Sequence, residues 1–395
     1  MRPPYECRDD RTRSQGTSAG EPTTSRGESS GGGSATTIIW REGDVTGDVA
    51  GGAEGVGSLE TMTIAPAWDA GVLRAHSAPH FMQGRTWAEV RAHGPWTAEP
   101  VDLGMSQELP ALAYERRADG VGTLRHLPRV SGVTGDSVPR LTARVVSDRG
   151  WAFATKLELY QPRDPALDVA FAAAGWRPTR ASQYRYAIVV DLRGGEDAIL
   201  ARMKKRARSE IRAGERNGIV VERAALGGAD EDEMIALVRT TEQRSGAFFR
   251  SDDYLRTVWN AFAAGGRGRL YLARHHGRVV SGAFVACFGR RAWYKDGGST
   301  RDVPQLMASR LLQWRIMQEL AADGYVEYDL GHVPPPDSAH PAGRGILIFK
   351  SAFAARAVEY QPAYLLVHEE VGERWRLCES AFLAAHRAAT GDDFY

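Results

Sequence analysis

Residues 200–218 read Leu-Ala-Arg-Met-Lys-Lys-Arg-Ala-Arg-Ser-Glu-Ile-Arg-Ala-Gly-Glu-Arg-Asn-Gly. On a helix of about 100° per residue, the apolar side chains of this stretch form one narrow stripe. The stripe consists of Leu200, Met203, Ala207, Ile211 and Gly214. Asn217-Gly218 ends the pattern, because both residue types tolerate the left-handed conformation that closes helices. The stretch therefore predicts one amphipathic helix that packs its apolar stripe against a core.

Cations follow one edge of that stripe. Lys204, Arg208 and Arg212 recur at every fourth position, and Lys205 and Arg216 lie just beyond them. A guanidinium presents a planar fork that matches phosphate, so a row of cations along a buried edge suits an anionic ligand in a cleft. The alternative is a solvated basic face that pairs with nearby glutamates. The stretch alone leaves both interpretations open.

The composition is that of a folded chain with room for two medium domains. The chain has 395 residues, of which 43% are hydrophobic and 25% charged, with a formal net charge of +1. No apolar run approaches the roughly 20 residues that span a bilayer, and the N-terminus has no apolar signal core. Cys7, Cys287 and Cys378 are too few and too scattered for a disulfide framework or a zinc site. We therefore expect a cytoplasmic protein, in which any contact with nucleic acid is local.

Lysine is rare in this chain. Among the 50 basic residues, five are lysines, namely Lys156, Lys204, Lys205, Lys295 and Lys350. Each of these positions is a candidate for a place where a compact ammonium is preferred to a guanidinium.

The order of elements divides the chain into three parts. Residues 1–58 are rich in Gly, Ser, Thr, Arg and Glu, which predicts a disordered tail. Residues 59–198 and 199–395 each give alternating strands and helices, which predicts two tandem α/β domains around a shared cleft.

The predicted elements follow from periodicity and from turn residues. Expected strands are 111–115, 123–127, 151–160, 183–191, 270–274, 279–288, 291–295, 325–330 and 358–368. Expected helices, besides 200–218, are 138–148, 164–174, 230–244, 252–263, 304–322 and 373–389.

Five short motifs occur in a fixed order along most of this ordered sequence. They are Gln83 with Trp87 and Arg91; the basic stretch from Met203 to Gly218; Gly277, Gly282 and Tyr294 with Gly297-Gly298-Ser299; Leu312-Gln313-Trp314 with Tyr328-Asp329-Leu330-Gly331; and Gly345 with Phe349-Lys350 and Phe353. In this order and spacing they resemble the Fem family of non-ribosomal peptidyl transferases, from about residue 82 to residue 353.

The resemblance implies two domains of the acetyltransferase-like (GNAT) fold. We expect no cofactor and no metal. It implies an aminoacyl-tRNA as donor, with the amino acid passed to a stem-peptide amine of a UDP-linked or lipid-linked muramyl pentapeptide. A lipid-linked acceptor would bring the protein into peripheral contact with the inner membrane face. We expect a monomer.

The reaction that the resemblance implies is aminolysis of an ester, which develops an oxyanion that needs a nearby cation. By resemblance, Lys350 and Phe349 act in catalysis. Lys350 follows the apolar run Ile346-Leu347-Ile348-Phe349, so we expect it to emerge from a buried segment. The alternative for Lys350 is a strand-end lysine that reaches out to water.

Six further residues are candidates for binding the precursor. Arg208, Arg212 and Lys204 would hold its phosphates, with Arg91 across the cleft, and Tyr294 and Asp136 would contact the rest of it. Tyr294 is equally explained as an ordinary strand aromatic. Asp329 either accepts a proton or caps a strand end, and we favour the structural role.

Two rival functions stay open. The first is an acyl-CoA N-acyltransferase on the same fold, for which Arg129-Val-Ser-Gly-Val-Thr134 is a near match to the loop that cradles a pyrophosphate. The second is a non-catalytic module that binds a cell-wall precursor or tRNA.

Overall fold

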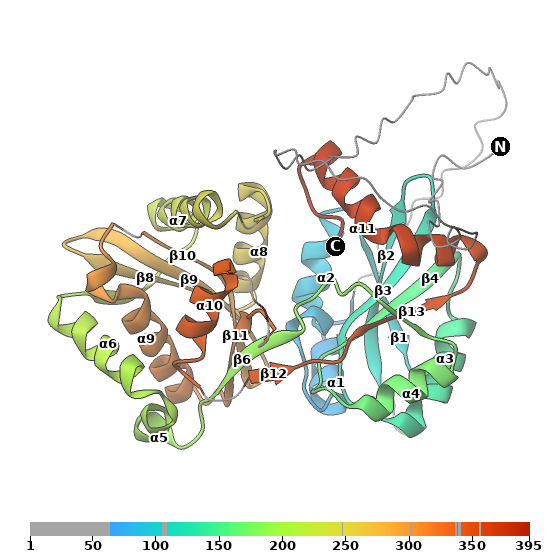
Figure 1. The fold of residues 1–395 in the computed structure, drawn as a ribbon, viewed down its shortest axis with the longest axis horizontal. Helices are drawn as coiled ribbons and strands as arrows, with labels where there is room; N and C mark the ends of the chain where they lie inside the picture. The colour runs from blue at the N-terminus through green and yellow to red at the C-terminus, as the bar shows by residue number, and fades with distance from the viewer. Residues whose placement is uncertain are drawn as a thin grey trace, which may run out of the picture. The chain divides into compact units, whose positions relative to one another are not determined.

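The computed structural model describes residues 64–104, 109–246, 248–300, 302–335, 338, 341–354 and 357–395 (Figure 1). Within these ranges the chain is a mixed α/β structure that contains a six-stranded and a seven-stranded sheet. The tail predicted over residues 1–58 lies outside the described residues. None of the described helices combines the length and the apolar character that crossing a membrane requires.

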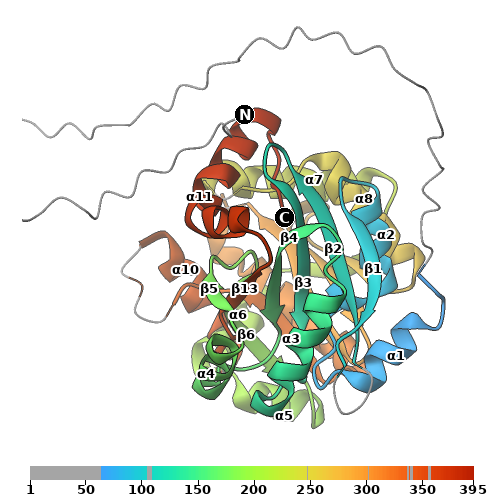
Figure 2. The same ribbon diagram turned by 90° about the vertical axis from the view of Figure 1, so that its right-hand side faces the viewer.

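The six-stranded sheet has the order β1-β2-β3-β4-β13-β5, and only its β3–β4 pair is parallel (Figure 2). Its strands are β1 (Thr97–Asp102), β2 (Pro110–Ala118), β3 (Gly122–Val130), β4 (Ala152–Leu159), β5 (Arg177–Thr179) and β13 (Ala363–Val367). The helical segments with this sheet are α1 (Trp68–Ala75), η1 (Phe81–Gln83), α2 (Arg85–Ala92), η2 (Gly135–Ser137), α3 (Val138–Ser147), α4 (Pro165–Ala173) and α11 (Glu370–Thr390).

The seven-stranded sheet has the order β12-β6-β11-β10-β9-β8-β7, and only its β10–β11 pair is parallel. Its strands are β6 (Tyr186–Asp191), β7 (Val220–Ala224), β8 (Gly268–His275), β9 (Arg278–Phe288), β10 (Arg291–Ser299), β11 (Glu327–His332) and β12 (Ala357–Glu359). The helical segments with it are α5 (Gly195–Arg202), α6 (Lys205–Arg216), α7 (Ala229–Ser245), α8 (Asp252–Ala264), η3 (Pro304–Leu306), α9 (Ala308–Ala322) and α10 (Pro341–Lys350).

Helices cover both faces of the seven-stranded sheet, and the alternation of β8 shows how (Figure 1). Leu270 and Leu272 belong to the same apolar cluster as Val258 of α8. Tyr271 and Ala273, one residue out of phase, belong to the cluster that contains Leu311 of α9. Because side chains alternate across a strand, both faces of this sheet are buried under helices.

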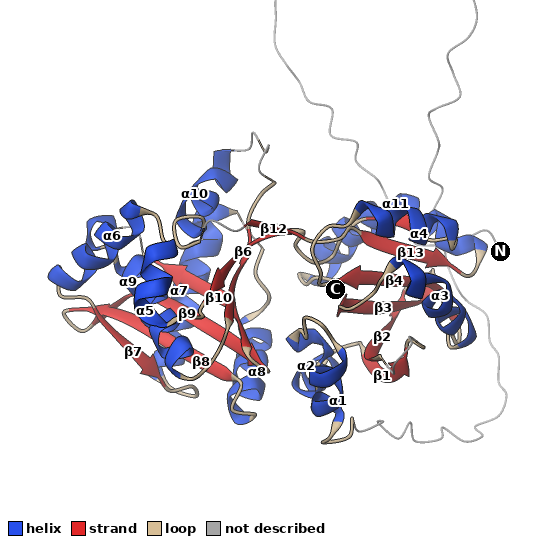
Figure 3. Cartoon of the chain, turned by 90° about the horizontal axis from the view of Figure 1, so that it is seen from below, coloured by secondary structure: helices blue, strands red, loops and turns tan. Residues whose placement is uncertain are grey.

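Two strands cross the division that the sequence suggests at residue 198. β6 precedes residue 198 but pairs with β11 and β12 of the seven-stranded sheet. β13 lies near the C-terminus but pairs with β4 and β5 of the six-stranded sheet (Figure 3). The chain therefore passes between the two sheets twice, and the division into domains at residue 198 remains a prediction.

The single strand expected over residues 358–368 is wrong, because it is two short strands, β12 and β13, in different sheets. Pro362 lies between them. Proline has no backbone N–H and cannot donate to a ladder, so it interrupts the strand where the chain changes sheet.

The single helix expected over residues 200–218 is also wrong. The chain forms α5, leaves the helical conformation at Met203 and Lys204, and begins again as α6 at Lys205. The backbone N–H of Lys204 donates to the carbonyl of Ala352, 2.9 Å away. This contact with a segment distant in sequence replaces a helical hydrogen bond, which sequence periodicity alone does not reveal. The apolar stripe itself is confirmed, because Met203, Ala207, Ile211 and Gly214 are all buried.

A fully buried ion pair holds α11 on the six-stranded sheet. Lys156 of β4 is 0% exposed, and its Nζ lies 2.6 Å from a carboxylate oxygen of Glu379. The hydroxyl of Thr179 donates to the other carboxylate oxygen of Glu379 at 3.1 Å. A buried charge that loses its partner is strongly destabilising, since no water replaces the lost interaction.

We expect Glu379→Ala to lower the free energy of unfolding by about 3–5 kcal/mol, because it leaves the Lys156 ammonium buried without its counter-charge. Denaturant unfolding followed by circular dichroism measures this change. The matched control is Glu370→Ala on the same helix, which removes an exposed pair with Arg374 and should cost less than about 1 kcal/mol. Equal costs for the two variants would contradict the assignment.

Candidate functional site

The candidate site lies where the parallel ladder between β10 and β11 ends. The two strands pair at three positions, the last of which joins Trp293 to Asp329. Beyond that pair β10 continues to Ser299 and β11 to His332, and β10 carries an irregularity between Tyr294 and Asp296. The ladder therefore ends inside the sheet and not at its rim.

Lys350 reaches this position from the last residue of α10. Its Nζ donates to the carbonyl oxygen of His332 at 2.8 Å and lies 5.8 Å from the ring centroid of Tyr294. A Cβ atom on Gly331 would lie 3.8 Å from the same Nζ. Burial lowers the pKa of Lys350 from its ordinary value to about 8, against the carboxylate of Asp329, which raises it.

The surroundings of Lys350 differ from the expectation in one respect. The residue ends a helix, and the preceding run is not buried, since Ile346 and Ile348 are exposed. Four consecutive residues of a helix point in all directions around its axis, so such a run cannot be buried throughout. Leu347 and Phe349 pack against the core cluster, and Phe349 also contacts the ring of Phe353.

Tyr294 depends on a glycine for its place beside Lys350. Its hydroxyl lies over Gly297, where a Cβ atom would be only 1.8 Å from the tyrosine oxygen. Burial, and then the nearby Asp296 carboxylate, raise the pKa of Tyr294, so its hydroxyl remains a donor at neutral pH. The next glycine, Gly298, allows α7 to approach closely, because a Cβ there would lie 2.5 Å from the backbone of Leu237.

The structure brings Lys204 to the Lys350 segment. The Nζ of Lys204 is 3.3 Å from the hydroxyl of Ser351, the residue that follows Lys350. Lys204 is also the N-cap residue of α6, a 12-residue helix whose N-terminal N–H groups carry partial positive charge. The Lys204 ammonium and this helix N-terminus therefore lie beside the residue that follows Lys350, an arrangement that favours an anionic group there.

The two arginines of α6 differ in their contacts. Arg208 is engaged within the protein, because its guanidinium donates to the carbonyls of Leu200 and Met203 at the end of α5. Arg212 is exposed and makes no hydrogen bond or ion pair with any residue that the structure describes. Arg212 is thus available to a ligand, whereas Arg208 would have to exchange one set of oxygen partners for another.

Arg91 and Asp136 are not brought into contact with the residues around Lys350. Arg91 is 8% exposed, and its guanidinium packs 4.7 Å from the ring of Trp96. Asp136 is exposed in η2, after β3 of the six-stranded sheet. Their assignment to precursor binding therefore remains a prediction without a shared contact to support it.

Several motif residues have structural contacts. Gln83 is 0% exposed and joins η1 to the sheet, since Leu112 N–H donates to its side-chain oxygen at 2.7 Å. Two of the motifs meet in the core, where the hydroxyl of Tyr328 donates to the side-chain oxygen of Gln313 at 2.9 Å. These polar residues therefore fix the framework around the site.

Sequence reasoning missed Arg310 of α9. This buried guanidinium donates to Glu210 of α6 at 2.6 Å and to the backbone carbonyl of Phe349. It also stacks on the Phe349 ring, 4.3 Å from its centroid. The available signal was an arginine four residues before Trp314 on the apolar stripe of the helix, a position where a charge is unusual.

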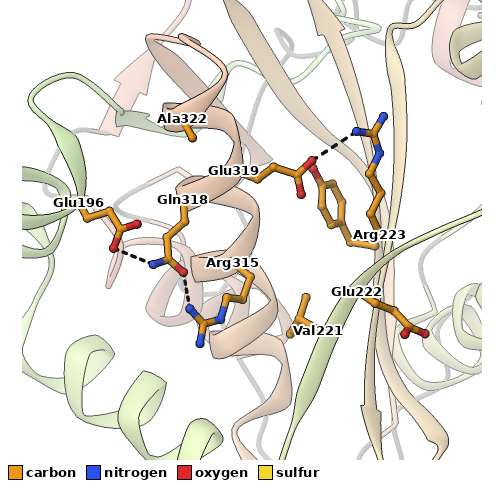
Figure 4. A pocket seen from close by; sticks show the side chains of 9 residues that line it. Glu196, Val221, Glu222, Arg223, Arg315, Gln318, Glu319 and Ala322 are labelled. Carbon is orange, nitrogen blue, oxygen red and sulfur yellow. Dashed lines mark hydrogen bonds and ion pairs between the residues drawn. The ribbon is translucent and has the colours of Figure 1, made fainter.

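A surface hollow of about 390 Å³ lies between α9 and β7, at the opposite edge of the sheet from β12 and β6 (Figure 4). Its polar side chains are largely paired with one another: Gln318 with Glu196 at 2.7 Å, Arg315 with Gln318 at 2.7 Å and Arg223 with Glu319 at 3.5 Å. The sequence candidates do not line it. No group of three His, Cys, Asp or Glu side chains suited to a metal occurs among the described residues.

The loop from Arg129 to Thr134, which resembles a CoA-binding turn, makes its hydrogen bonds within the protein. The Arg129 side chain is 2% exposed and donates to the carbonyl of Tyr184 at 2.8 Å. Thr134 and Ser137 cap each other's backbone at the start of η2. The backbone N–H groups of Ser131, Val133 and Thr134 also donate within the protein, to the side chains of His76, Gln161 and Ser137. Amides that would cradle a pyrophosphate are therefore already engaged.

Comparison with known proteins identifies a matching domain family and a solved structure with the same fold. Residues 201–339 match the family model described as an acetyltransferase (GNAT) domain. A solved structure titled "Crystal structure of FemX" superposes with a TM-score of 0.67 at 18% identity, covering 81% of this chain and 100% of that one. Two tandem GNAT-like domains of mixed α/β type are thereby confirmed as the fold.

Two enzymes are similar in sequence. The UDP-N-acetylmuramoylpentapeptide-lysine N(6)-alanyltransferase of Weissella viridescens is 26% identical over 182 residues, which is 44% of this chain and 51% of that protein. The lipid II:glycine glycyltransferase of Staphylococcus saprophyticus is 18% identical over 379 residues, covering 75% of this chain and 90% of that protein. The match to the alanyltransferase spans about half of its length.

We expect Gly297→Ala to displace Tyr294 and to lower the free energy of unfolding by about 1–3 kcal/mol, because the added methyl group overlaps the tyrosine ring. Adding Tyr294→Ala should remove most of the overlap, so the two costs should not add. Thermal denaturation of both single variants and the double variant measures this coupling.

The control is Gly345→Ala in α10, where the new methyl group meets nothing within 4 Å. Alanine is favoured over glycine in a helix, so this variant should be as stable as the parent chain or more so. Strict additivity of the Gly297 and Tyr294 substitutions would contradict the contact.

Proposed function

We propose that this chain, a member of the Fem family, is an aminoacyltransferase that adds an amino acid to the stem-peptide amine of a peptidoglycan precursor. The donor would be an aminoacyl-tRNA, and the product would contribute to an interpeptide bridge of the cell wall. The observation that carries the proposal is the place of Lys350, whose ammonium lies beside Tyr294 where the β10–β11 ladder ends.

The proposed reaction forms one bond and breaks another. The neutral acceptor amine attacks the ester carbonyl carbon of the aminoacyl-tRNA and forms a C–N bond. The C–O bond to the ribose then breaks, and the proton lost by the amine ends on the ribose oxygen. The negative charge that develops on the carbonyl oxygen, and then on the ribose oxygen, requires a nearby cation.

Lys350 is the cation for that charge. Its Nζ has one identified protein partner, the His332 carbonyl, which leaves two of its three N–H donors for a substrate oxygen. Partial burial strengthens the interaction of the ammonium with a developing anion, because less water screens it. Phe349 and Arg310 fix the end of α10 and thereby fix the direction of the lysine.

The phosphates of the precursor are assigned to the N-terminal end of α6. Lys204 lies one residue before the helix and beside Ser351, so a phosphate held there would place the precursor next to Lys350. Exposed Arg212 is a second candidate on the same helix. This arrangement serves a nucleotide-linked or a lipid-linked acceptor equally, because both carry a diphosphate.

The acyl-CoA alternative is less well supported. Its best sequence feature was the loop from Arg129 to Thr134, and the backbone N–H groups of Ser131, Val133 and Thr134 in that loop already donate within the protein. A binding module without catalysis would have no need for a lysine held at the end of the β10–β11 ladder.

The proposal is tested with purified protein, a mixed pool of charged tRNAs and either the nucleotide-linked or the lipid-linked pentapeptide, with mass spectrometry of the acceptor. We expect a mass gain of one amino acid that RNase treatment of the donor abolishes. Lys350→Ala should reduce kcat by about a hundredfold or more, as loss of a group at a developing oxyanion does.

The matched control is Lys205→Ala, which removes an exposed lysine from the same basic stretch and should change the rate by no more than about threefold. An acyl gain from acyl-CoA, with none from tRNA, would replace the proposal by the first alternative. Precursor binding without any mass gain would favour the binding module.

We also expect the pH dependence of the transfer to report the charge of Lys350. The acceptor amine must be neutral to attack, and for a lysine-type amine the neutral fraction increases up to its ordinary pKa of about 10. The pKa of Lys350 is about 8, so its ammonium is present below that pH and is lost above it. The two effects offset each other above that pH, so kcat/KM for the precursor should rise with pH and level off at about 8. An arginine stays charged throughout this range, so in Lys350→Arg the kcat/KM that remains should continue to rise above that pH. A plateau at the same pH in that variant would contradict the assignment.

A further inference from the structure

A buried carboxylate, that of Asp329, lies three residues before His332, whose carbonyl holds Lys350. Asp329 is 2% exposed, and one of its oxygens accepts three tyrosine hydroxyls. The distances are 2.7 Å from Tyr160, 3.0 Å from Tyr184 and 3.2 Å from Tyr360. The other oxygen accepts the backbone N–H of Gly331 at 2.7 Å. We call these four side chains, of Asp329 and the three tyrosines, the Asp329 cluster.

The three tyrosines come from separate parts of the chain. Tyr160 directly follows β4 of the six-stranded sheet, and Tyr184 precedes β6. Tyr360 directly follows β12, in the segment that passes from one sheet to the other. Asp329 itself belongs to β11 of the seven-stranded sheet. The cluster therefore joins both sheets and both segments that connect them.

The buried guanidinium of Arg129 packs against the rings of the same three tyrosines. The central carbon of Arg129 lies 4.3 Å from the ring centroid of Tyr184, 5.1 Å from that of Tyr360 and 5.4 Å from that of Tyr160. Its Nε has no hydrogen-bond partner among the described residues. A positive charge next to electron-rich ring faces offsets part of the cost of burying the Asp329 carboxylate.

The cluster needs the tyrosines as donors, and their ionisation is suppressed. Burial, and then the Asp329 carboxylate, raise the pKa of Tyr160, Tyr184 and Tyr360 well above the ordinary value. The three hydroxyls therefore keep their protons at any pH at which the protein is studied. Three O–H donors and one N–H donor are enough to satisfy a carboxylate that water does not reach.

Two residues, Leu330 and Gly331, connect Asp329 to His332, whose carbonyl oxygen holds Lys350. The Asp329–Gly331 hydrogen bond closes a tight turn, in which Gly331 has a φ of +73°. The next residue, His332, presents the carbonyl oxygen that accepts the Lys350 Nζ. The position of that carbonyl, and hence of the ammonium, therefore depends on the turn that Asp329 holds.

We infer that Asp329 is a positioning residue for Lys350. Its carboxylate fixes the Gly331–His332 turn on which the ammonium is held, and its three tyrosine partners tie that turn to both sheets. The inference rests on the proposed aminoacyl transfer, because the position of Lys350 matters only for a reaction that Lys350 serves. It assigns Asp329 no contact with substrate, which distinguishes it from a proton acceptor.

The geometry also makes the charge of Asp329 measurable at Lys350. The groups identified around the Lys350 ammonium are Asp329 and His332 of β11 and Tyr294 of β10. Lys204 contacts the hydroxyl of the next residue, Ser351. Asp329 is the only carboxylate among these named groups. Its charge raises the pKa of Lys350, so its removal should lower that pKa further.

The test compares Asp329→Asn with the parent chain in two measurements. The first is the pH dependence of acetylation of Lys350 by acetic anhydride, followed by mass spectrometry, which needs no substrate. In Asp329→Asn we expect the midpoint to move down by about half a pH unit or more, because a negative charge near the amine is lost. Lys205, which is exposed, serves as an internal reference within each sample.

The second measurement is transfer to the pentapeptide under saturating donor. Asp329→Asn should lower kcat about tenfold while changing the KM for the precursor by less than about threefold, because a displaced Lys350 weakens the transition state and not the ground state. The pH at which kcat/KM levels off should move down together with the acetylation midpoint.

The matched control is Asp168→Asn. The Asp168 carboxylate also accepts a buried tyrosine hydroxyl, that of Tyr364 at 2.6 Å, but on the α4 side of the six-stranded sheet. This variant should leave the titration of Lys350 unchanged. Tyr360→Phe is the milder variant of the cluster, since it removes one donor and keeps the charge; it should lower kcat with little shift of the midpoint.

The outcomes separate the two proposals. If the parent chain transfers no amino acid but the Lys350 midpoint moves in Asp329→Asn and not in Asp168→Asn, the proposed function fails and the electrostatic link stands. If transfer occurs but neither the midpoint nor kcat changes in Asp329→Asn, the inference is overturned. A loss of kcat with an unchanged midpoint in a folded variant would also overturn it, because a purely structural role explains that result.

Discussion

A carboxylate that water does not reach must find all its hydrogen-bond donors within the protein, and this constraint organises the centre of the molecule. Asp329 draws its donors from β11, from the end of β4 and from both segments that connect the sheets. Loss of any one partner would leave a buried charge under-satisfied, so these segments are held together by a shared electrostatic requirement. The apolar cluster that includes Phe81, Phe262 and Trp293 supplies area around this point but does not by itself specify which backbone atoms meet.

Two glycines and the end of the β10–β11 pairing give this framework its candidate site. The parallel pairing of β10 and β11 stops at Trp293 and Asp329, so the residues that follow are free to serve other contacts. Tyr294 occupies the space that Gly297 leaves, and Lys350 lies beside the turn at Gly331. The first contact requires that position 297 carries no side chain, and the second requires the positive φ of +73° that Gly331 adopts. A lysine with a pKa of about 8 results, because the same framework that places the ammonium also removes much of its water.

The sequence was informative wherever a local pattern decides the outcome. Alternating apolar residues predicted β8 to β10, and the order of motifs implied the tandem GNAT-like fold, which is confirmed. It was uninformative where distant segments decide, since nothing in residues 358–368 shows that Pro362 separates strands of two different sheets. The same reason hid the Asp329 cluster. Tyr160, Tyr184 and Tyr360 are ordinary strand-flanking tyrosines until the chain folds, and Arg310 is an ordinary helix arginine until Glu210 and Phe349 meet it.

The basic stretch from Leu200 to Gly218 is broken at Met203 and Lys204, and this break determines what its cations contact. An unbroken helix would give Lys204, Arg208 and Arg212 equivalent places along one edge. The break at Met203 and Lys204 makes them different: Arg208 closes the end of α5, Arg212 stays exposed, and Lys204 begins α6 beside Ser351. The break itself arises because Lys204 N–H bonds to Ala352 and not to its own helix. The segment that ends in Lys350 therefore shapes the basic helix, and an anion bound at the start of α6 would be adjacent to the lysine by construction of the fold.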